Sequence, residues 1–348
     1  MPWRLVIFVV LWHAAVVGFA AAVTGRAPII GRVPLARGEF FAAVLAASWT
    51  VSVAGLWVIA GLGMLLRAAG VVSGRGLLGY RPLFAGLSAL VALLAGGLVW
   101  ARWVEPRRVT VTRQEVALAG LRGRVRVVHL SDTHSDPRFP IEDEVVARVN
   151  ALAPDVIVFT GDALNRRGRA PAFRAMLAGL RARDAKLAVR GNWDVWYWGG
   201  IDLFAGTGFD ELTAGWRTLD TAAGPLHVGG HAYTDDARWR ELLGTPPAGG
   251  PRVFLYHTPD FVPEAAASGL ELYLCGHTHA GQVRVPGYGA LVTLARHGRR
   301  FQGGRYLVGN LVAYVSRGLG VEAGIPLRLG APPEIACLDL VSAPPPRR

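Results

Sequence analysis

Side chains that bind metal ions follow almost every short apolar run in the second half of the sequence. In chain order they stand in the motifs Asp132-Thr133-His134, Gly161-Asp162, Gly191-Asn192-Trp193-Asp194, His257 and Gly276-His277-Thr278-His279. Each motif alone is common in turns and helix caps, but five in this order, each after an apolar run, form a strong signal. Because ligands of open α/β sheets gather outside the carboxyl ends of the strands, we expect these side chains to converge.

The donor atoms in these motifs indicate the kind of ion. Carboxylate and amide oxygens mixed with imidazole nitrogens suit Mn, Fe or Zn better than Mg or Ca. One carboxylate shared by two ions is the arrangement of two-metal hydrolytic sites, so we expect two divalent ions. The glycines before Asp162, Asn192 and His277 are expected to let the backbone turn sharply at these ligands.

The elements that must position the motifs are those of an α/β domain over residues 107–342. Apolar runs predict buried strands at Val125–Leu130, Asp155–Thr160, Leu187–Val189, Val253–Tyr256 and Leu272–Leu274. Amphipathic stretches predict helices at Ile141–Leu152 and Ala170–Leu180. Gly199–Gly250 is rich in glycine and weakly periodic, so no element is predicted there. Residues 343–348 read as a disordered tail.

Residues 1–106 have the composition of a membrane anchor with three transmembrane helices. Leu5–Gly25, Phe40–Leu66 and Pro82–Ala101 contain no charged residue, and each reaches the roughly 20 residues needed to cross a bilayer. A cleaved signal peptide with Arg4 in its basic region is the alternative for the first segment. Three spans place the N-terminus and the large domain on opposite sides of the membrane.

The arginines near the span ends predict the orientation. Four lie on the N-terminal side and seven on the side of the large domain, namely Arg4, Arg67, Arg75 and Arg81 against Arg26, Arg32, Arg37, Arg102, Arg107, Arg108 and Arg113. Positive charge favours the cytoplasmic side. We therefore expect a multi-pass protein of the inner (plasma) membrane with a cytoplasmic catalytic domain.

Charge and cysteine content exclude other classes of protein. The net charge is +12, but residues 1–104 carry eight arginines and a single acidic residue, so much of the excess belongs to the anchor. A nucleic-acid partner is therefore not favoured. The only two cysteines, Cys275 and Cys337, form neither a disulfide framework nor a CxxC pair. The sequence does not indicate an oligomeric state.

The order DxH, GD, GNxD, H, GHxH resembles that of the calcineurin-like metallophosphoesterase superfamily. The stretches Gly276–Gln282 (GHTHAGQ), Tyr314–Gly320 (YVSRGLG) and Pro333-Glu334-Ile335 are similar to its membrane-associated bacterial YkuE/YaeI-like branch. The resemblance covers residues 109–341 and implies a two-sheet αββα sandwich. It also implies a metal-dependent hydrolase of phosphoric esters or anhydrides.

The resemblance assigns the ligands. Asp132, His134 and His279 would hold one ion and Asn192, His257 and His277 the other, with Asp162 bridging. Within this set, Asp162, Asn192 and His257 are the residues expected to carry catalysis. Trp193 and Arg317 are the residues expected to contact substrate, although the SRGLG motif around Arg317 is also consistent with a simple tight turn.

Trp193 departs from the family pattern, which has a histidine there that is thought to help protonate the leaving group. Indole cannot act as a general acid. Either another group, such as Asp194 or a water molecule, supplies the proton, or the leaving group is already a weak base. The second reading favours cleavage of a pyrophosphate over a simple alkyl phosphate. The aromatic run Trp193, Trp196, Tyr197 and Trp198 is either a buried cluster or a loop that touches lipid or stacks on a base.

These features predict a membrane-anchored dinuclear phosphohydrolase that cleaves a phosphodiester or pyrophosphate. The proximity of a membrane makes a lipid-linked phosphate or a nucleotide a candidate substrate, as in the UDP-diacylglucosamine hydrolases of the same superfamily. The alternative is a membrane protein whose phosphoesterase-like domain binds a phosphorylated ligand with little turnover.

Overall fold

The computed structural model describes residues 81–234, 238–322 and 326–343, together with Ile29–Ile30, Val33–Pro34 and Gly55. The chain divides into two compact units, residues 1–102 and 103–348. The expected spans Leu5–Gly25 and Phe40–Leu66 lie outside the described residues, apart from Gly55.

In the first unit, strands β1 (Ile29–Ile30) and β2 (Val33–Pro34) form a short antiparallel pair. The third expected span is helical: α3 covers Arg81–Val99 and is followed by a π-helical turn, Trp100–Val104. Among the described residues, the helical stretch Ser88–Arg107 is the single one long and apolar enough to cross a membrane, by length and composition.

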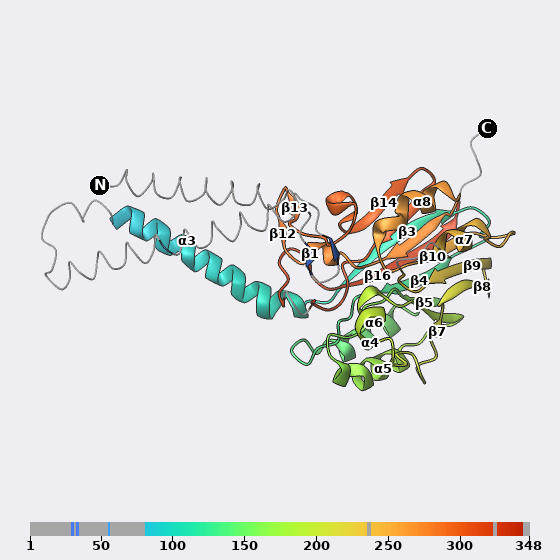
Figure 1. Cartoon of the computed structure of the whole chain (residues 1–348), viewed down its shortest axis with the longest axis horizontal. Coiled ribbons are helices and arrows are strands. Elements are labelled where there is room, and N and C mark those ends of the chain that lie inside the picture. Colours follow the sequence, from blue (N-terminus) through green and yellow to red (C-terminus); the bar gives the residue numbers. More distant parts are fainter. Residues whose placement is uncertain are drawn as a thin grey trace, which may run out of the picture. The chain divides into compact units, whose positions relative to one another are not determined.

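The second unit is built on two six-stranded sheets (Figure 1). In order, the first sheet contains β3 (Thr110–Leu118), β16 (Glu334–Ser342), β4 (Val125–Leu130), β5 (Val156–Phe159), β6 (Ala185–Ala188) and β7 (Asp210–Glu211). The second contains β14 (Gly304–Val308), β15 (Leu311–Val315), β11 (Leu272–Cys275), β10 (Arg252–Leu255), β9 (Gly224–His231) and β8 (Ala214–Thr221).

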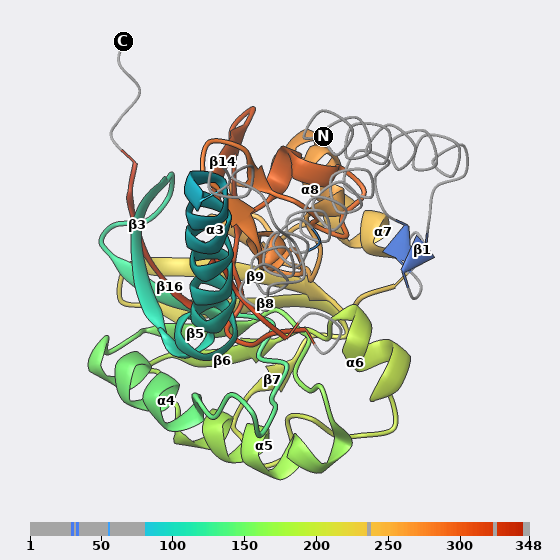
Figure 2. The same cartoon turned by 90° about the vertical axis from the view of Figure 1, so that its left-hand side faces the viewer.

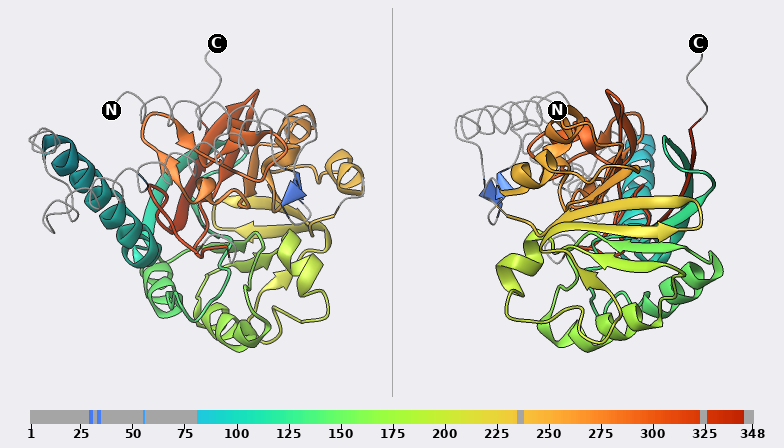
Figure 3. Two further views of the ribbon diagram at one scale, coloured as in Figure 1. Left: turned by 60° about the vertical axis from the view of Figure 1, so that its left-hand side comes forward. Right: turned by 90° about the vertical axis from the view of Figure 1, so that its right-hand side faces the viewer.

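Five α-helices and a small hairpin complete the described part of this unit. The helices are α4 (Glu142–Ala151), α5 (Ala170–Gly179), α6 (Asn192–Tyr197), α7 (Arg238–Gly244) and α8 (Val262–Ala267). Strands β12 (Arg284–Val285) and β13 (Gly289–Ala290) form the hairpin. Figures 2 and 3 show α4 and α5 on the outer face of the first sheet and the second sheet on its other face.

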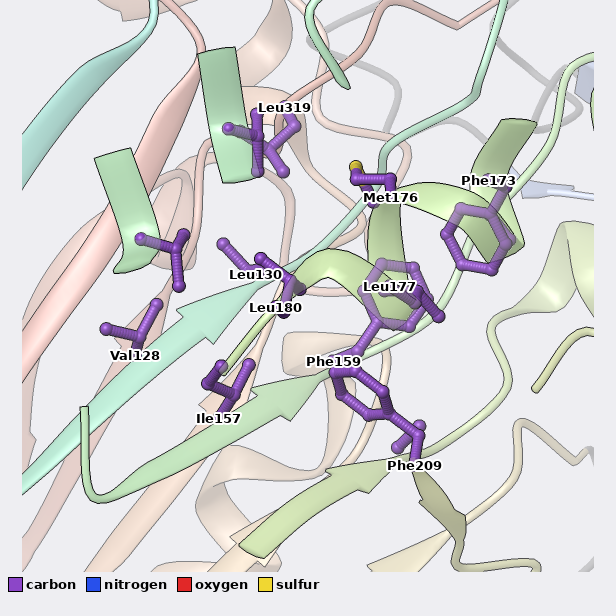
Figure 4. Close-up of a cluster of buried hydrophobic side chains, with 14 of the residues drawn as sticks. Val128, Leu130, Ile157, Phe159, Phe173, Met176, Leu177, Leu180, Phe209 and Leu319 are labelled. Atoms are coloured by element: carbon purple, nitrogen blue, oxygen red, sulfur yellow. The ribbon is translucent and has the colours of Figure 1, made fainter. Parts of the chain in front are cut away.

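The layers follow from the two-residue period of the strands. In β5, Val156 and Val158 face the space between the sheets, whereas Ile157 and Phe159 pack under α4 and α5 (Figure 4). In β10, Val253 and Leu255 likewise join the layer between the sheets, and Phe254 packs on the outer side with residues of α7 and α8. Strands that are buried on both faces read as continuous apolar runs. The result is the αββα layering that the family resemblance implied.

The predicted strands and helices are present, with ends shifted by one or two residues. The unassigned stretch Gly199–Gly250 contains the hairpin β8–β9 and helix α7. Strand β8 was missed because it is half exposed, with the burial of an edge strand. Its side chains therefore do not form the apolar run that marks the buried strands.

The carboxyl ends of the parallel strands meet at one edge of the sandwich. β4, β5 and β6 run parallel in the first sheet, and β9, β10, β11 and β15 do so in the second. The loops that leave these ends contact one another. Within the sheets, Asp132 N–H donates to Gly161 O and Gly276 N–H to His257 O; between the sheets, Leu319 N–H donates to Ser131 O. We call this edge the site edge.

Candidate metal centre

Two groups of buried histidine and aspartate side chains lie at the site edge. One consists of Asp132, His134 and His279, the other of Asp162, His257 and His277, and in each the ligand atoms lie within 4.8 Å of one another. All six side chains are buried. These are the six His and Asp ligands expected from the sequence, divided between two groups as expected.

Direct distances link the members of both groups. His279 Nε2 lies 3.3 Å from Asp132 Oδ1, and His257 Nε2 lies 3.2 Å from Asp162 Oδ2. The same Asp162 oxygen is 3.6 Å from His134 Nε2 of the other group.

Asn192 joins the second group. Its Oδ1 lies 3.1 Å from His277 Nδ1, which is itself 3.2 Å from His257 Nε2. All seven predicted ligands are thus brought together.

Two of the histidine rings, those of His257 and His277, are oriented by hydrogen bonds on the side that faces away from the metal groups. His257 Nδ1 lies 2.7 Å from Thr160 O, and His277 Nε2 lies 3.0 Å from Leu294 O. Because a carbonyl only accepts, these nitrogens carry protons, and in the neutral ring the lone pair is on the opposite nitrogen. His257 Nε2 and His277 Nδ1 therefore face the site, which is the orientation that outer partners usually give to metal-binding histidines. The residues present fit divalent cations.

The electrostatics of the site also favour cations. Burial by itself raises the pKa of Asp132, but interactions with the neighbouring histidine side chains, His279 first among them, outweigh it and lower that pKa. Burial lowers the pKa of His134 to about 4, so its ring is neutral, as a ligand must be. His257 differs: although burial lowers its pKa, the charge and hydrogen bond of Asp162 raise it to about 9. His257 must therefore lose a proton when a divalent cation binds.

Most ligands sit on left-handed backbone, which is uncommon for residues with a Cβ. The φ angles of Asp132, His134, Asp162, His277 and His279 lie between 37° and 70°. Such conformations are strained for L-residues and persist where the surrounding structure imposes them. They let two side chains of one short loop reach the metal groups, as Asp132 and His134 do in the first group.

The glycines before the ligands serve two different purposes. Gly161 has a φ of 98°, as expected for a sharp turn. Gly191 has a φ of −87°, and what excludes a side chain there is space: a Cβ would lie 2.2 Å from Asp162 Oδ1. At Gly276 a Cβ would lie 2.0 Å from Asp132 Oδ2. The expectation of a sharp turn thus holds at Gly161, whereas close approach of a ligand carboxylate explains Gly191 and Gly276.

Asp194 holds the ligand loops together. Its carboxylate accepts the backbone N–H groups of Asp162, Ala163 and Gly191 at 2.8–2.9 Å, and the side chain is fully buried. Burial and the charge of Asp162 raise its pKa to about 7. Because both oxygens are occupied by backbone donors, this geometry does not favour Asp194 as the proton donor that replaces the family histidine.

The two residues expected to contact substrate lie in different surroundings. The half-buried Trp193 meets the ring of His134 edge-on, with centroids 5.1 Å apart, so it borders the first group. The Arg317 guanidinium is held by the chain itself: Nη2 lies 3.3 Å from Glu334 Oε1 and donates to the hydroxyls of Thr110 and Thr112. Substrate contact by Trp193 and by Arg317 stays a prediction.

The aromatic run contains half-buried tryptophans and an exposed tyrosine. Trp198 donates from Nε1 to Leu164 O and packs against the core of the first sheet. Tyr197 of α6 is 53% exposed.

Sequence reasoning missed Arg328. This side chain is fully buried, and its guanidinium donates to Gly320 O, to Ala331 O at 2.8 Å and to His279 Nδ1 at 3.1 Å. It therefore supports the loop that carries a ligand. The sequence did contain a signal, because Arg328 is the single charged residue in the apolar stretch Ile325–Leu329. A charged side chain in such a stretch is expected to be buried with hydrogen-bond partners.

Comparison with known proteins agrees with this geometry. A family model described as calcineurin-like phosphoesterase matches residues 125–281. The metallophosphoesterase YkuE of Bacillus subtilis is 32% identical over 284 residues, which cover 75% of this chain and 96% of that protein. The chain belongs to the calcineurin-like metallophosphoesterases.

Two further relatives belong to the same family of metallophosphoesterases. The transmembrane protein with metallophosphoesterase domain from Bos taurus is 31% identical over 309 residues, covering 80% of this chain and 66% of that protein. The phosphodiesterase YaeI of Escherichia coli is 37% identical over 106 residues, covering 30% of this chain and 38% of that protein. This calcineurin-like metallophosphoesterase is accordingly a metal-dependent phosphoester hydrolase of the YkuE/YaeI-like branch.

Replacing Asp162 with Asn is expected to weaken both metal groups at once. The change removes the charge of the oxygen that lies near both groups, so metal content should fall below two ions per chain. Turnover should fall by more than the roughly 10–100-fold that loss of an outer-shell partner costs. Elemental analysis and circular dichroism would measure metal content and fold.

Asp339→Asn is the matched control, because Asp339 pairs with Arg126 away from the site. Two retained ions and unchanged turnover in Asp162→Asn would contradict a shared carboxylate.

Proposed function

We propose that the chain is a membrane-anchored, dinuclear phosphohydrolase that cleaves a phosphodiester or pyrophosphate bond of a lipid-linked or nucleotide substrate. The observation that carries the proposal is the position of Asp162 Oδ2, which has a histidine of each group within 3.6 Å. One oxygen within reach of both groups supports a bridging ligand. Its partners would be Asp132, His134 and His279 on one ion and Asn192, His257 and His277 on the other.

When bound, two divalent ions of the Mn, Fe or Zn type neutralise phosphoryl oxygens and activate water for in-line attack. The chain's own part is orientation. Trp193 N–H donates to Asp162 Oδ1 at 2.9 Å, which leaves Oδ2 to face both groups. The carbonyls of Thr160 and Leu294 hold the rings of His257 and His277 in place.

The absence of a titratable side chain at Trp193 supports a substrate whose leaving group is a weak base. The indole borders His134, at the position where the family histidine would protonate the departing oxygen, and Asp194 is occupied by backbone donors. A phosphate that leaves from an anhydride needs little protonation. This favours pyrophosphate over a simple alkyl phosphate.

Membrane anchoring is supported by two observations. The stretch Ser88–Arg107 is apolar and long enough to cross a bilayer, and the related protein from Bos taurus is described as transmembrane. The excess of arginine on the side of the large domain favours a cytoplasmic orientation in the inner membrane. A multi-pass anchor over residues 1–106 is part of the proposal.

A second candidate function is binding of a phosphorylated ligand with little turnover. Trp193 is the observation that favours it, because the proton donor of the family is missing there. The complete ligand set favours hydrolysis.

The purified full chain is expected to hydrolyse bis(p-nitrophenyl) phosphate in the presence of Mn²⁺. Chelation should abolish the activity and Mn²⁺ should restore it, because the chemistry requires the ions. Release of p-nitrophenol measures the rate, with Asp162→Asn as the inactive control. Tight binding of the diester without turnover at two bound ions would instead support the ligand-binding function.

Without a general acid, the rate should depend steeply on the pKa of the leaving group, because negative charge develops on the departing oxygen. Aryl esters and anhydrides should be cleaved readily and alkyl esters slowly. Trp193→His should accelerate alkyl esters most, by up to the roughly 10²–10⁴-fold that general acids contribute. A series of phosphodiesters of graded leaving-group pKa measures this dependence.

Trp193→Phe is the matched control, since it keeps an aromatic ring without a proton to donate. Equal wild-type rates for alkyl and aryl diesters, with the chemical step rate-limiting, would show that another group supplies the proton.

The orientation can be tested by reporter fusions to the C-terminus. If the large domain is cytoplasmic, an alkaline phosphatase fusion should be inactive and a fluorescent protein fusion bright. The opposite pair of results would place the catalytic domain outside the cytoplasm, with a different pool of substrates.

A further inference from the structure

The catalytic unit begins at the same edge of the sandwich that carries the metal-binding groups. Strands β3 and β16 are parallel, with Thr110 opposite Glu334. Strand β16 is antiparallel to β4, with Ala336 opposite His129. The start of β3 therefore lies level with the end of β4, from which the chain continues into Asp132.

Side-chain contacts tie the first residues of this unit to the loops of the site edge. Arg107 Nη2 donates to Arg138 O at 2.8 Å, in the loop that follows His134. Glu105 Oε1 accepts the N–H of Ala331 at 2.7 Å, and the carbonyl of Ala331 binds Arg328, which contacts His279. The apolar stretch Ser88–Arg107 thus ends within the framework of the metal centre.

The surface around this entry point is basic. We call five arginines the basic rim: the exposed Arg107, Arg108, Arg166 and Arg167 and the half-buried Arg138.

One buried carboxylate organises part of this rim. Arg138 Nη2 lies 2.7 Å and Arg166 Nε 3.9 Å from Asp136, whose side chain is 1% exposed. Two arginines therefore share one buried carboxylate, and the rim presents net positive charge to solvent.

At the opposite edge, several arginines are paired with acids. Arg126 pairs with Asp339 at 2.8 Å, Arg183 with Asp184 at 3.0 Å and Arg252 with Glu271 at 2.7 Å. These residues lie at the starts of the parallel strands, which is the end of the sandwich away from the metal groups.

Exposed aromatic side chains accompany the basic rim. Trp103, the first residue of the unit, is 55% exposed, and Tyr197 on α6 is 53% exposed. Helix α6 begins at the ligand Asn192. Arginine together with exposed Trp and Tyr is the combination that suits a headgroup layer, since the rings rest at the interface and the guanidinium groups meet anionic lipids.

We propose that the site edge is a membrane-contacting surface that docks on anionic lipid headgroups, so that the enzyme takes its phosphorylated substrate from that layer. The substrate class is an amphiphile with its phosphodiester or pyrophosphate at headgroup depth. This deepens the proposed function and rests on its membrane anchoring and hydrolysis. Anionic lipid is inferred as the partner from charge complementarity, because the rim is cationic. The rim also lies at the edge where the chain continues from the apolar stretch Ser88–Arg107.

A spin label on either edge tests the docking directly. Arg167→Cys places the label in the rim, and Asp220→Cys places it beside the β8–β9 turn at the opposite edge, where Asp220 is exposed. The native Cys275 and Cys337 are buried and free. The full chain would be reconstituted in nanodiscs of phosphatidylglycerol and phosphatidylcholine that contain a nickel-chelating headgroup lipid.

Relaxation of the label by the nickel lipid should be strong at position 167 and weak at position 220. Equal relaxation at both positions would overturn the docking surface, whether or not the enzyme is active. This outcome is independent of the proposed hydrolysis.

Charge reversal separates docking from chemistry. Arg166→Glu with Arg167→Glu should lower kcat/KM for a dialkyl lipid p-nitrophenyl phosphodiester in anionic nanodiscs by about tenfold or more. The rate on soluble bis(p-nitrophenyl) phosphate should stay within about twofold, which also reports that the variant is folded. The matched control is Arg122→Glu with Arg124→Glu at the opposite edge, where both side chains are exposed.

An unchanged rate on the lipid diester in the rim variant, or an equal loss in both variants, would overturn the proposal. If the rim variant does not fold, the label comparison decides. If the wild-type chain hydrolyses neither diester, the proposed function fails, and the label comparison still tests the membrane contact.

Discussion

Two carboxylates buried at one edge of the sandwich are the constraint on which the site depends. A charged carboxylate away from water is costly unless positive charge or hydrogen-bond donors surround it. Asp132 and Asp162 obtain this environment from three histidine side chains and from backbone N–H groups, including those of His277 and Trp193. The same surroundings make the site a receptor for divalent cations. The arrangement that stabilises the two buried carboxylates is therefore also the one that suits divalent cations.

The backbone around these carboxylates is held in conformations that isolated loops would avoid. Asp132, Asp162 and His277 adopt positive φ, and Gly191 and Gly276 allow the loops to approach within van der Waals distance of the carboxylates. The rigid support comes from the strands, which are buried on both faces and leave the loops little freedom. Asp194 adds to it by binding three backbone N–H groups from two loops. Strain at the ligands is thus balanced by packing and hydrogen bonding away from them.

The two edges of the sandwich place their acidic side chains differently. At the starts of the strands, arginines pair with acids that water still reaches, as Arg126 does with Asp339. At the carboxyl ends, Asp132, Asp162 and Asp136 are buried, whereas Glu142 and Glu211 pair with Arg169 and Arg190. The metal groups thus draw on the buried acids of this edge, and the half-buried acids form ion pairs around them.

From the sequence alone, the buried strands and the metal-binding motifs that follow them could be predicted, and the family resemblance implied the αββα layering and the set of seven ligands. The strands are continuous apolar runs, and each ligand follows one of them, so chain order was sufficient to predict convergence at one edge. The tertiary structure decided which side chains pair when the partners are distant in the sequence. It paired Arg328 with His279, 49 residues away, and Arg317 with Glu334. It also occupied Asp194 with backbone donors and placed the start of the catalytic unit beside the metal groups. Apolar patterns in the sequence indicate which segments are buried and with what periodicity. The hydrogen-bond partners of a side chain, and the loops that meet at one edge of the sandwich, are fixed only when the sheets are assembled.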